Sequence, residues 1–334
     1  GKSVNQMIKN FVKIILVSVC FVIFLSACNN TSQYTQSQSD EPISQPQTVY
    51  ESTVSAENPD NLSQLMNGCG KTVTVYGELN TSRYSDAISE LQTVLDSYSR
   101  NISLAVYSLN SDRALAYNTE TAIFGACTVK AAYALYACRQ MENGNGSLGD
   151  ELTYLEKHYE SGTGDMQYSP FGTVFTVETA LYKTMSISDN VGYRMIVDYF
   201  GTEGYNKFIR ELGCDSLQIK PTVWSLHTRS NDLVRLWRCI YDYFETDTEY
   251  SRFLYKSCTN TAFNYATSSP DGAEYSHKQG SNSKGDWLSY SDAGIVWKDG
   301  SPYIMALLTD APGPSGYDNG VFDQIIDIVY NRLF

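Results

Sequence analysis

The stretch Ala126-Cys127-Thr128-Val129-Lys130 lies where a polar loop gives way to an apolar, helix-forming segment. Free backbone N–H groups and the helix dipole favour an anion at such a helix start. Residues three apart on a helix share a face, so Cys127 and Lys130 are expected to point the same way. Both influences favour the thiolate, which makes Cys127 a candidate nucleophile. Taken alone, the stretch also fits a buried cysteine beside a surface lysine.

Two further polar motifs follow along the chain. Ser188-Asp189-Asn190 lies between two expected helices, and residues 277–281 read His-Lys-Gln-Gly-Ser at the end of an expected strand. Taken alone, the first motif is a helix cap, because Ser, Asp and Asn all cap helices well. The second, taken alone, is a polar strand end.

The apolar periodicity around these motifs outlines the remaining elements. Helices are expected at residues 84–98, 127–141, 177–185, 191–200, 203–212, 232–244, 250–258 and 322–334. Strands are expected at residues 102–109, 113–117, 274–279, 289–297 and 303–309. The short connections between successive strands predict hairpins and hence an antiparallel sheet. We therefore expect an α+β fold, with a five-stranded antiparallel sheet flanked by helices and a helical subdomain.

Taken in order, the three motifs resemble the S-x-x-K, S-D-N and K-T-G boxes of class A β-lactamases and penicillin-binding proteins. Ser188 follows Cys127 by 61 positions, and Phe124 precedes it shortly, as in that family. Residues 291–297 resemble the strand that follows the K-T-G strand. The resemblance covers residues 84–334 and implies a β-lactamase/transpeptidase-like fold.

The resemblance also implies roles for the residues of the first two motifs. Cys127 would be the nucleophile, and Lys130 would take its proton or lower its pKa. Ser188 would relay a proton to the leaving nitrogen. Asn190 would hydrogen-bond a substrate amide.

The third motif would form the substrate-binding strand, with Lys278, Gln279, Gly280 and Ser281. Lys278 would supply positive charge for a substrate carboxylate and for Ser188. The backbone N–H groups of Cys127 and Ser281 would form the oxyanion hole.

Three departures from the family pattern bear on function. Cys127 replaces the serine nucleophile, and a thiolate does not need the strong base that serine needs. Gln279 replaces the threonine of K-T-G, which removes a hydroxyl that Ser281 would compensate only in part. Residues 217–231 contain no glutamate to position a deacylating water. Lys278 follows Ser188 by only 90 positions, which indicates a trimmed loop.

Three functions stay open at this point. The first is a class A β-lactamase-like acyl hydrolase that acts on β-lactams or related amides through an acyl-enzyme with slow deacylation. The second is a D,D-peptidase-like enzyme that acts on peptidoglycan stem peptides, with an amine as acyl acceptor. The third is a non-catalytic lipoprotein that binds peptidoglycan or a β-lactam.

The amino-acid composition limits the classes of binding partner and cofactor that we expect. The formal net charge of −13 disfavours nucleic acid and anionic membrane surfaces. The three histidines, His158, His227 and His277, show no zinc-ligand spacing, so we expect no metal, and no cofactor is implied. The eight cysteines show neither a disulfide framework nor a paired CxxC pattern. We expect a monomer.

The N-terminal segment has the pattern of an export signal. Three lysines precede a short apolar run at residues 14–25, which ends in Leu25-Ser26-Ala27-Cys28. This ending resembles a bacterial lipobox, in which Cys28 carries the lipid. It implies an exported lipoprotein of the bacterial cell surface or envelope, attached to the membrane through that lipid alone.

The domain organisation follows from these segments. Residues 1–28 are expected to be the lipoprotein signal peptide, residues 29–82 a low-complexity tether, and residues 83–334 the catalytic domain. The segment up to about Pro59 is rich in Ser, Gln, Thr and Asn and cannot bury enough apolar surface to fold. Residues 72–76 alternate like a short strand, but nothing around them predicts a domain.

Overall fold

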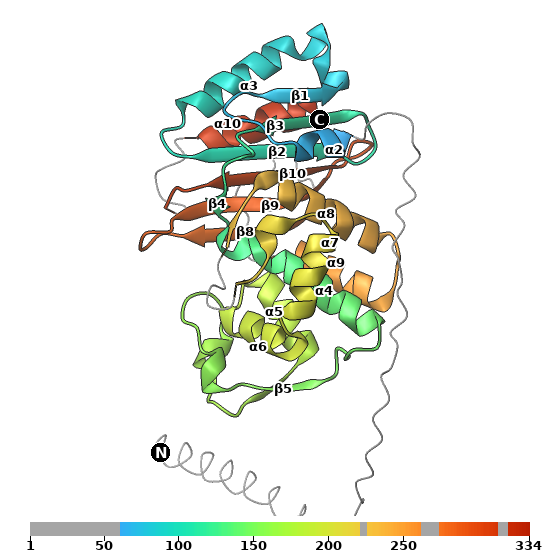
Figure 1. The fold of residues 1–334 in the computed structure, drawn as a ribbon, viewed down its shortest axis with the longest axis vertical. Coiled ribbons are helices and arrows are strands. Elements are labelled where there is room, and N and C mark those ends of the chain that lie inside the picture. The colour runs from blue at the N-terminus through green and yellow to red at the C-terminus, as the bar shows by residue number, and fades with distance from the viewer. Residues whose placement is uncertain (1–60, 221–225, 262–273, 313–319) are drawn as a thin grey trace, which may run out of the picture. The chain divides into compact units, whose positions relative to one another are not determined.

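A six-stranded antiparallel sheet, in the order β1-β3-β2-β10-β9-β8, organises the fold (Figure 1). The structure is a computed structural model that describes residues 61–220, 226–261, 274–312 and 320–334. Its strands are Thr74–Gly77 (β1), Ile102–Ser108 (β2), Arg113–Tyr117 (β3), Glu274–Asn282 (β8), Ser289–Trp297 (β9) and Tyr303–Thr309 (β10). Every neighbouring pair is antiparallel.

The two faces of the sheet belong to different cores because successive side chains of a strand point to opposite sides. On β2, Leu104 and Val106 join the core formed with helices α3 (Ser85–Ser97) and α10 (Val321–Ile328). Ala105 joins the core of the other face. The α10 helix continues as a π-helix over Val329–Leu333.

The second face carries the helical subdomain. Its helices are Lys130–Glu142 (α4), Val177–Ser186 (α5), Asn190–Phe200 (α6), Glu203–Glu211 (α7), Ser230–Phe244 (α8) and Glu249–Thr259 (α9). The α8 helix packs on β2, β9 and β10, and its Trp237 is fully buried. Ser230 Oγ at its start lies 2.7 Å from Ser103 Oγ on β2. Side-chain caps begin α5, α6 and α9: Thr176, Asp189 and Thr248 each accept a hydrogen bond from a backbone N–H of the first turn.

The predicted fold class is confirmed, with one more strand than expected. All five predicted strands and all eight predicted helices are present. The helix predicted at residues 127–141 begins as a 3₁₀ turn, Ala126–Val129, and becomes α-helical at Lys130. Two small pairs were too short to predict: β4 (Ile123–Phe124) with β7 (His227–Thr228), and β5 (Glu151–Thr153) with β6 (Val174–Thr176).

The prediction that the tether extends to residue 82 is wrong for residues 61–82, and the domain does not begin at residue 83. This segment forms helix α2 (Asn61–Met66) and the edge strand β1, which pairs with β3. Leu65 and Leu79 are fully buried, and Glu78 forms an ion pair of 2.9 Å with Arg113. The strand-like alternation at residues 72–76 was too short to predict a part of the domain, because its apolar residues are covered only by a core that the rest of the chain builds.

The N-terminal predictions lie outside the described residues. They concern the signal segment 1–28, the lipid-bearing Cys28 and the tether at residues 29–60. Within the ranges that the structure describes, no helix combines the length and the apolar character needed to cross a membrane.

Replacing Leu65 by alanine tests whether residues 61–82 belong to the folded domain. Leu65 is fully buried in the core shared with α8 and β3. We expect Leu65→Ala to lower the free energy of unfolding by about 2–5 kcal/mol in urea titrations, as for other buried leucines. Ser63→Ala, at an exposed site of the same helix, should change it by less than about 0.5 kcal/mol. Equal stability of both variants would contradict the corrected boundary.

Candidate active site

The end of strand β8 lies unusually close to the turn that carries Cys127. A Cβ atom on Gly280 would lie 2.5 Å from the carbonyl oxygen of Gly125 and 2.7 Å from the amide nitrogen of Cys127. No real side chain tolerates such distances, so only glycine allows the strand to approach. The predicted third motif is therefore in contact with the first through backbone atoms.

A cleft of about 280 Å³ opens between β8 and the helical subdomain. Cys127 is half-buried in its wall. The cleft is lined by Phe124, Ala126, Cys127, Val129, Lys130, Glu160, Ser161, Gly162, Thr163, Asn190, Tyr193, Ser281 and Asn282. Ser188 and Lys278 lie directly behind this wall, with 0% and 1% of their surface exposed.

Backbone strain marks two residues of the motifs. Ala126, just before Cys127, has a φ of 45°, and Ser188 has a φ of 61°. Residues other than glycine rarely adopt this left-handed region, and such strain concentrates at functional sites. The strained turns aim the following helix start at the cleft in one case and the Ser188 side chain at Lys278 in the other.

Lys130 holds the first two motifs together. Its Nζ donates to the carbonyl oxygen of Ser188 at 2.7 Å and to Oδ1 of Asn190 at 2.8 Å. It also lies 5.6 Å from the centre of the Tyr193 ring. With 4% of its surface exposed, the ammonium is fixed in place by these acceptors.

Lys278 connects the third motif to the second. Its Nζ donates to Ser188 Oγ at 2.9 Å and to the carbonyl oxygen of Gln279 at 2.9 Å. Burial is the largest influence on it and, despite the opposing effect of Cys127, lowers the pKa of Lys278 to about 8. A lysine with such a pKa can take up or release a proton close to neutral pH, and the Ser188 hydroxyl is its hydrogen-bond neighbour.

The positive charges of Lys130 and Lys278 both act on the thiol of Cys127. Burial is the largest single influence and raises the pKa of the thiol, but Lys130 and Lys278 together with hydrogen bonding by Ser188 outweigh it. The net result is a pKa of about 7. Cys127 is thus substantially ionised at neutral pH, which is the condition for a nucleophilic thiol.

The other buried thiols behave in the opposite way. Burial raises the pKa of Cys138, Cys214 and Cys258, and it raises that of Cys239 to about 11. These cysteines lack two nearby ammonium groups, so they are inert packing residues.

Asn190 and Gln279 differ in their availability to a substrate. Asn190 lines the cleft, but its Oδ1 accepts from Lys130 and its Nδ2 donates to the carbonyl oxygen of Ser161 at 3.1 Å. The Gln279 side chain is buried, with Oε1 lacking a hydrogen-bond partner among the described residues, and it does not line the cleft. Ser281 does line it.

The loop at residues 160–164 forms a wall of the cleft that the sequence did not reveal. Thr163 Oγ1 donates to the carbonyl oxygen of Ser188 at 2.7 Å. The fully buried carboxylate of Asp189 accepts from the amides of Met166 and Gly192, at 2.9 and 2.8 Å. Asp189 therefore fixes both the loop and the start of α6. No local sequence motif predicts this wall, because the wall depends on the contact of Thr163 with Ser188 in the second motif.

Among the described residues that line the cleft, Glu160 carries a carboxylate, which the sequence reasoning missed. It forms an ion pair of 2.5 Å with Arg194. In the segment considered for a deacylating acid, residues 217–220 and 226–231 are described and hold none. Asp232 accepts from Ser216, from its amide at 3.0 Å and its hydroxyl at 2.6 Å, and so caps a turn.

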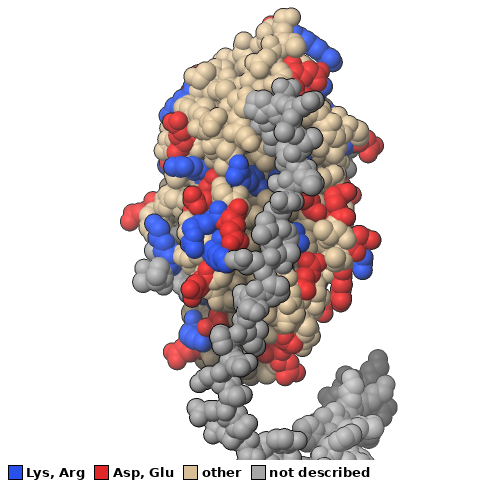
Figure 2. Space-filling model, turned by 45° about the vertical axis from the view of Figure 1, so that its right-hand side comes forward, with Lys and Arg blue, Asp and Glu red and all other residues tan. Residues whose placement is uncertain are grey.

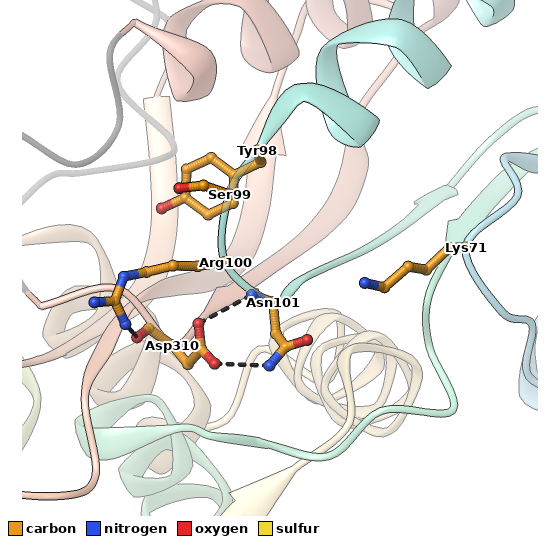
Figure 3. A pocket seen from close by; sticks show the side chains of 6 residues that line it. All are labelled: Lys71, Tyr98, Ser99, Arg100, Asn101 and Asp310. Carbon is orange, nitrogen blue, oxygen red and sulfur yellow. Dashed lines mark hydrogen bonds between the residues drawn. The ribbon is translucent and has the colours of Figure 1, made fainter.

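A larger hollow of about 540 Å³ lies elsewhere, at the start of β2 (Figure 3). Its polar groups serve one another: Asn101 donates to both carboxylate oxygens of Asp310, and Arg100 donates to the Asp310 carbonyl oxygen. Its lining contains no cysteine and no residue of the three motifs, so the smaller cleft at Cys127 is the candidate active site. Within the described ranges, His, Cys, Asp and Glu form no cluster able to hold a metal ion.

The surface around the fold carries both charge signs. Figure 2 shows Lys and Arg side chains interspersed with Asp and Glu on the face it presents, instead of one continuous basic patch. On this face of the described residues, the distribution forms no basic patch of the kind that attracts a nucleic-acid backbone.

The sequence profile of the beta-lactamase enzyme family matches residues 86–333. The chain belongs to this family. The match spans both the sheet and the helical subdomain and includes all three motifs, so the resemblance seen in the motifs is confirmed.

Individual relatives are distant. Beta-lactamase VEB-1 of Pseudomonas aeruginosa is 23% identical over 174 residues, which cover 51% of this chain and 56% of that protein. The chain therefore matches little more than half the length of this curated relative.

Among solved structures, PBP-A and the TLA-1 extended-spectrum beta-lactamase each have a TM-score of 0.67 at 20% identity. They cover 74% and 75% of this chain, and 95% and 99% of their own. A beta-lactamase from Chitinophaga pinensis gives 0.66 at 21% identity, covering 74% and 98%. These structures share the fold.

Alkylation of this beta-lactamase family member tests the ionisation of Cys127. Iodoacetamide reacts with thiolates, so the rate at Cys127 should rise with pH with a midpoint near 7. Lys130→Met removes the largest charge that opposes burial, and the midpoint should move upward by at least about one unit. Lys207→Met, at an exposed lysine of α7 that pairs with Glu211, is the control. An unchanged midpoint in Lys130→Met would contradict the electrostatic account.

Replacing Gly280 by alanine tests the close approach of β8. The added methyl group would meet Gly125 and Cys127 backbone atoms at 2.5 and 2.7 Å, and the strand must then retreat. We expect alkylation of Cys127 at pH 7 to slow several-fold, because Lys278 moves away with the strand. Gly70→Ala, at an exposed site where a Cβ meets nothing within 4 Å, should leave the rate unchanged. A normal rate in Gly280→Ala would show that the approach is not required.

Proposed function

We propose that this protein is an acyl hydrolase that acts on β-lactams or related amides through a thioester on Cys127, with slow deacylation. The observation that carries the proposal is the position of Cys127, with a pKa of about 7, between two buried lysines and Ser188. Cys127, the proposed nucleophile, lines the cleft, and Ser188, the proposed proton relay, lies directly behind its wall.

Acylation needs no group beyond those in the cleft. The Cys127 thiolate attacks the carbonyl carbon and forms a C–S bond, while the negative charge moves to the oxygen. The backbone N–H groups of Cys127 and Ser281 are the candidate donors to that oxygen. When the C–N bond breaks, Ser188 Oγ gives its proton to the leaving nitrogen and takes one from Lys278, 2.9 Å away.

The proposed substrate contacts follow from what is exposed. Ser188 and Lys278 are both covered by the cleft wall in the free protein, so this wall would have to move on substrate binding before Ser188 reaches the leaving nitrogen. Lys278 lies behind Ser188 and would act on the substrate through its charge and through that hydroxyl. An amide of the substrate would compete with Ser161 for Nδ2 of Asn190. Ser281 offers its hydroxyl on the cleft surface.

Hydrolysis of the thioester is expected to be slower than its formation. The cleft carboxylate, Glu160, is engaged with Arg194, and Asp232 is engaged with Ser216. Absence of a general base commonly costs roughly 10²- to 10⁴-fold in the step it serves. The higher reactivity of a thioester offsets part of this loss, and we expect the acyl-enzyme to accumulate.

A second candidate is a D,D-peptidase-like enzyme of peptidoglycan stem peptides, in which an amine accepts the acyl group. Ser188 and Lys278 favour it, because the groups that protonate a leaving amine also deprotonate an entering one by microscopic reversibility. A third possibility, a lipoprotein that binds β-lactam or peptidoglycan without catalysis, predicts no covalent adduct.

The kinetics of a reporter β-lactam test the proposal. Stopped-flow absorbance should show a burst near one equivalent of product followed by a shallow slope, and intact mass should show the adduct. Cys127→Ala should abolish both, because no nucleophile is left. Cys69→Ser, at another half-buried thiol, should behave as the parent.

Other outcomes separate the candidates. Acceleration of the slope by a D-amino acid, without a change in the burst, would favour transfer to an amine. Rapid multiple turnover with no trapped adduct would contradict slow deacylation and point to a water-activating group. Absence of any adduct would leave non-catalytic binding.

Localisation is proposed separately. We propose that the protein is exported and anchored in the bacterial envelope by a lipid on Cys28, on the strength of the segment Leu25-Ser26-Ala27-Cys28. Cys28→Ser should move the protein from the membrane fraction to the soluble fraction of cells. Equally firm membrane attachment of the variant would contradict the lipid anchor.

A further inference from the structure

The loop at residues 160–164 is the side of the cleft that no regular element holds. Of the described residues that line the cleft, those on the other sides belong to β4, β8, α4, α6 or the 3₁₀ turn before α4. Residues 160–163 belong to no helix or strand. The close approach of Gly280 also fixes β8 against the turn that carries Cys127. Because segments that move to admit a ligand are drawn from the less stable parts of a protein, this loop is the part of the wall best able to open.

The loop lies directly on the second motif. Thr163 Oγ1 donates to the carbonyl oxygen of Ser188 at 2.7 Å, and the carbonyl oxygen of Thr163 accepts from the amide of Asn190 at 3.1 Å. A Cβ atom on Gly164 would overlap the carboxylate and the Cα of Asp189, so only glycine allows the loop to lie so close. Ser188 and Asp189 have no exposed surface. The loop therefore covers the backbone of the second motif in the free protein.

A further contact of the loop occupies a group that the proposed function needs. Nδ2 of Asn190 is the proposed donor to a substrate amide, and here it donates to the carbonyl oxygen of Ser161 at 3.1 Å. The other polar atom of this side chain, Oδ1, accepts from Lys130 at 2.8 Å. With Oδ1 engaged in this way, a substrate amide and the loop compete for the same N–H group.

The loop is fastened at both ends and braced inside. Glu160 forms an ion pair of 2.5 Å with Arg194 on α6, and Asp165, directly after the loop, forms one of 2.6 Å with Lys183 on α5. Nε2 of Gln167 donates to two carbonyl oxygens of the loop, at 2.8 Å each. The contacts with the second motif can thus break while the ends of the loop stay attached, so the loop is built to lift without unfolding.

We propose that the loop at residues 160–164 is a lid that a substrate amide displaces by replacing the carbonyl group of Ser161 at Asn190. This inference rests on the proposed function. Opening separates Thr163 from Ser188 and uncovers the proton relay, which the closed lid keeps from water. A substrate binds only the open form, so the closed lid weakens its apparent affinity in proportion to the fraction of protein that is closed.

Replacing Thr163 by valine tests the lid. The variant keeps the shape of the side chain but lacks the hydroxyl that donates to Ser188, so more of the protein should be open. We expect acylation by benzylpenicillin below saturation, measured by intact mass, to become about three- to ten-fold faster, the range of one hydrogen bond. The rate at saturating benzylpenicillin should change less, because the bound substrate opens the lid in both proteins.

A matched threonine serves as the control. The hydroxyl of Thr173 donates to the carbonyl oxygen of Pro170, outside the loop, and Thr173→Val should be acylated at the rate of the parent. A threonine with a merely structural role would not accelerate the reaction when it is replaced. Acylation of Thr163→Val at or below the rate of the parent would overturn the lid and leave the proposed function standing.

Hydrogen exchange of the Asn190 amide covers the reverse case. This N–H donates to the carbonyl oxygen of Thr163, so its exchange reports opening of the lid without any catalysis. In the Cys127→Ala background, Thr163→Val should accelerate its exchange several-fold and Thr173→Val should not. This result in a protein whose Cys127 forms no adduct would keep the lid and overturn the proposed function. Equal exchange in the two valine variants would overturn the lid.

Discussion

The approach of Gly280 to the turn before Cys127 is the constraint on which the rest of the site depends. Because glycine has no Cβ, the end of β8 lies against the backbone of Gly125 and Cys127. This contact joins the sheet to the helical subdomain at the nucleophile. It also places Lys278 within 2.9 Å of Ser188. Two buried ammonium groups therefore act on one sulfur, and neither the sheet nor the helices could produce that arrangement alone.

Burial and charge act against each other in this cleft, and their balance explains why cysteine suits it. Burial raises the pKa of every other thiol for which a shift is resolved, yet Cys127 comes to about 7. Burial lowers the pKa of Lys278 to about 8. Because the pKa of the thiol lies below that of the ammonium, thiolate and ammonium coexist in the pH interval between the two values. As pH rises through the pKa of Lys278 its charge is lost, and the positive field that favours the thiolate weakens.

The sequence predicted most of the secondary structure because long amphipathic segments carry a clear period. It predicted Cys127, Lys130, Ser188 and Lys278 as one site only through the order of three motifs, each of which also fits an ordinary cap or strand end. It missed helix α2, and it showed the alternation of residues 72–76 without placing strand β1 in the domain. The few apolar residues of both elements enter a core built by distant segments. It also missed the loop at residues 160–164, because the contact of Thr163 with Ser188 is a property of the fold.

Chemical identification of the acyl linkage tests the central claim most directly. After incubation with a reporter β-lactam, peptide mapping should place the acyl group on the peptide that contains Cys127. Neutral hydroxylamine should release it within minutes, because it cleaves thioesters far faster than oxygen esters or amides. A label on the peptide that contains Ser188, or one that resists neutral hydroxylamine, would contradict the assignment of Cys127 as the nucleophile.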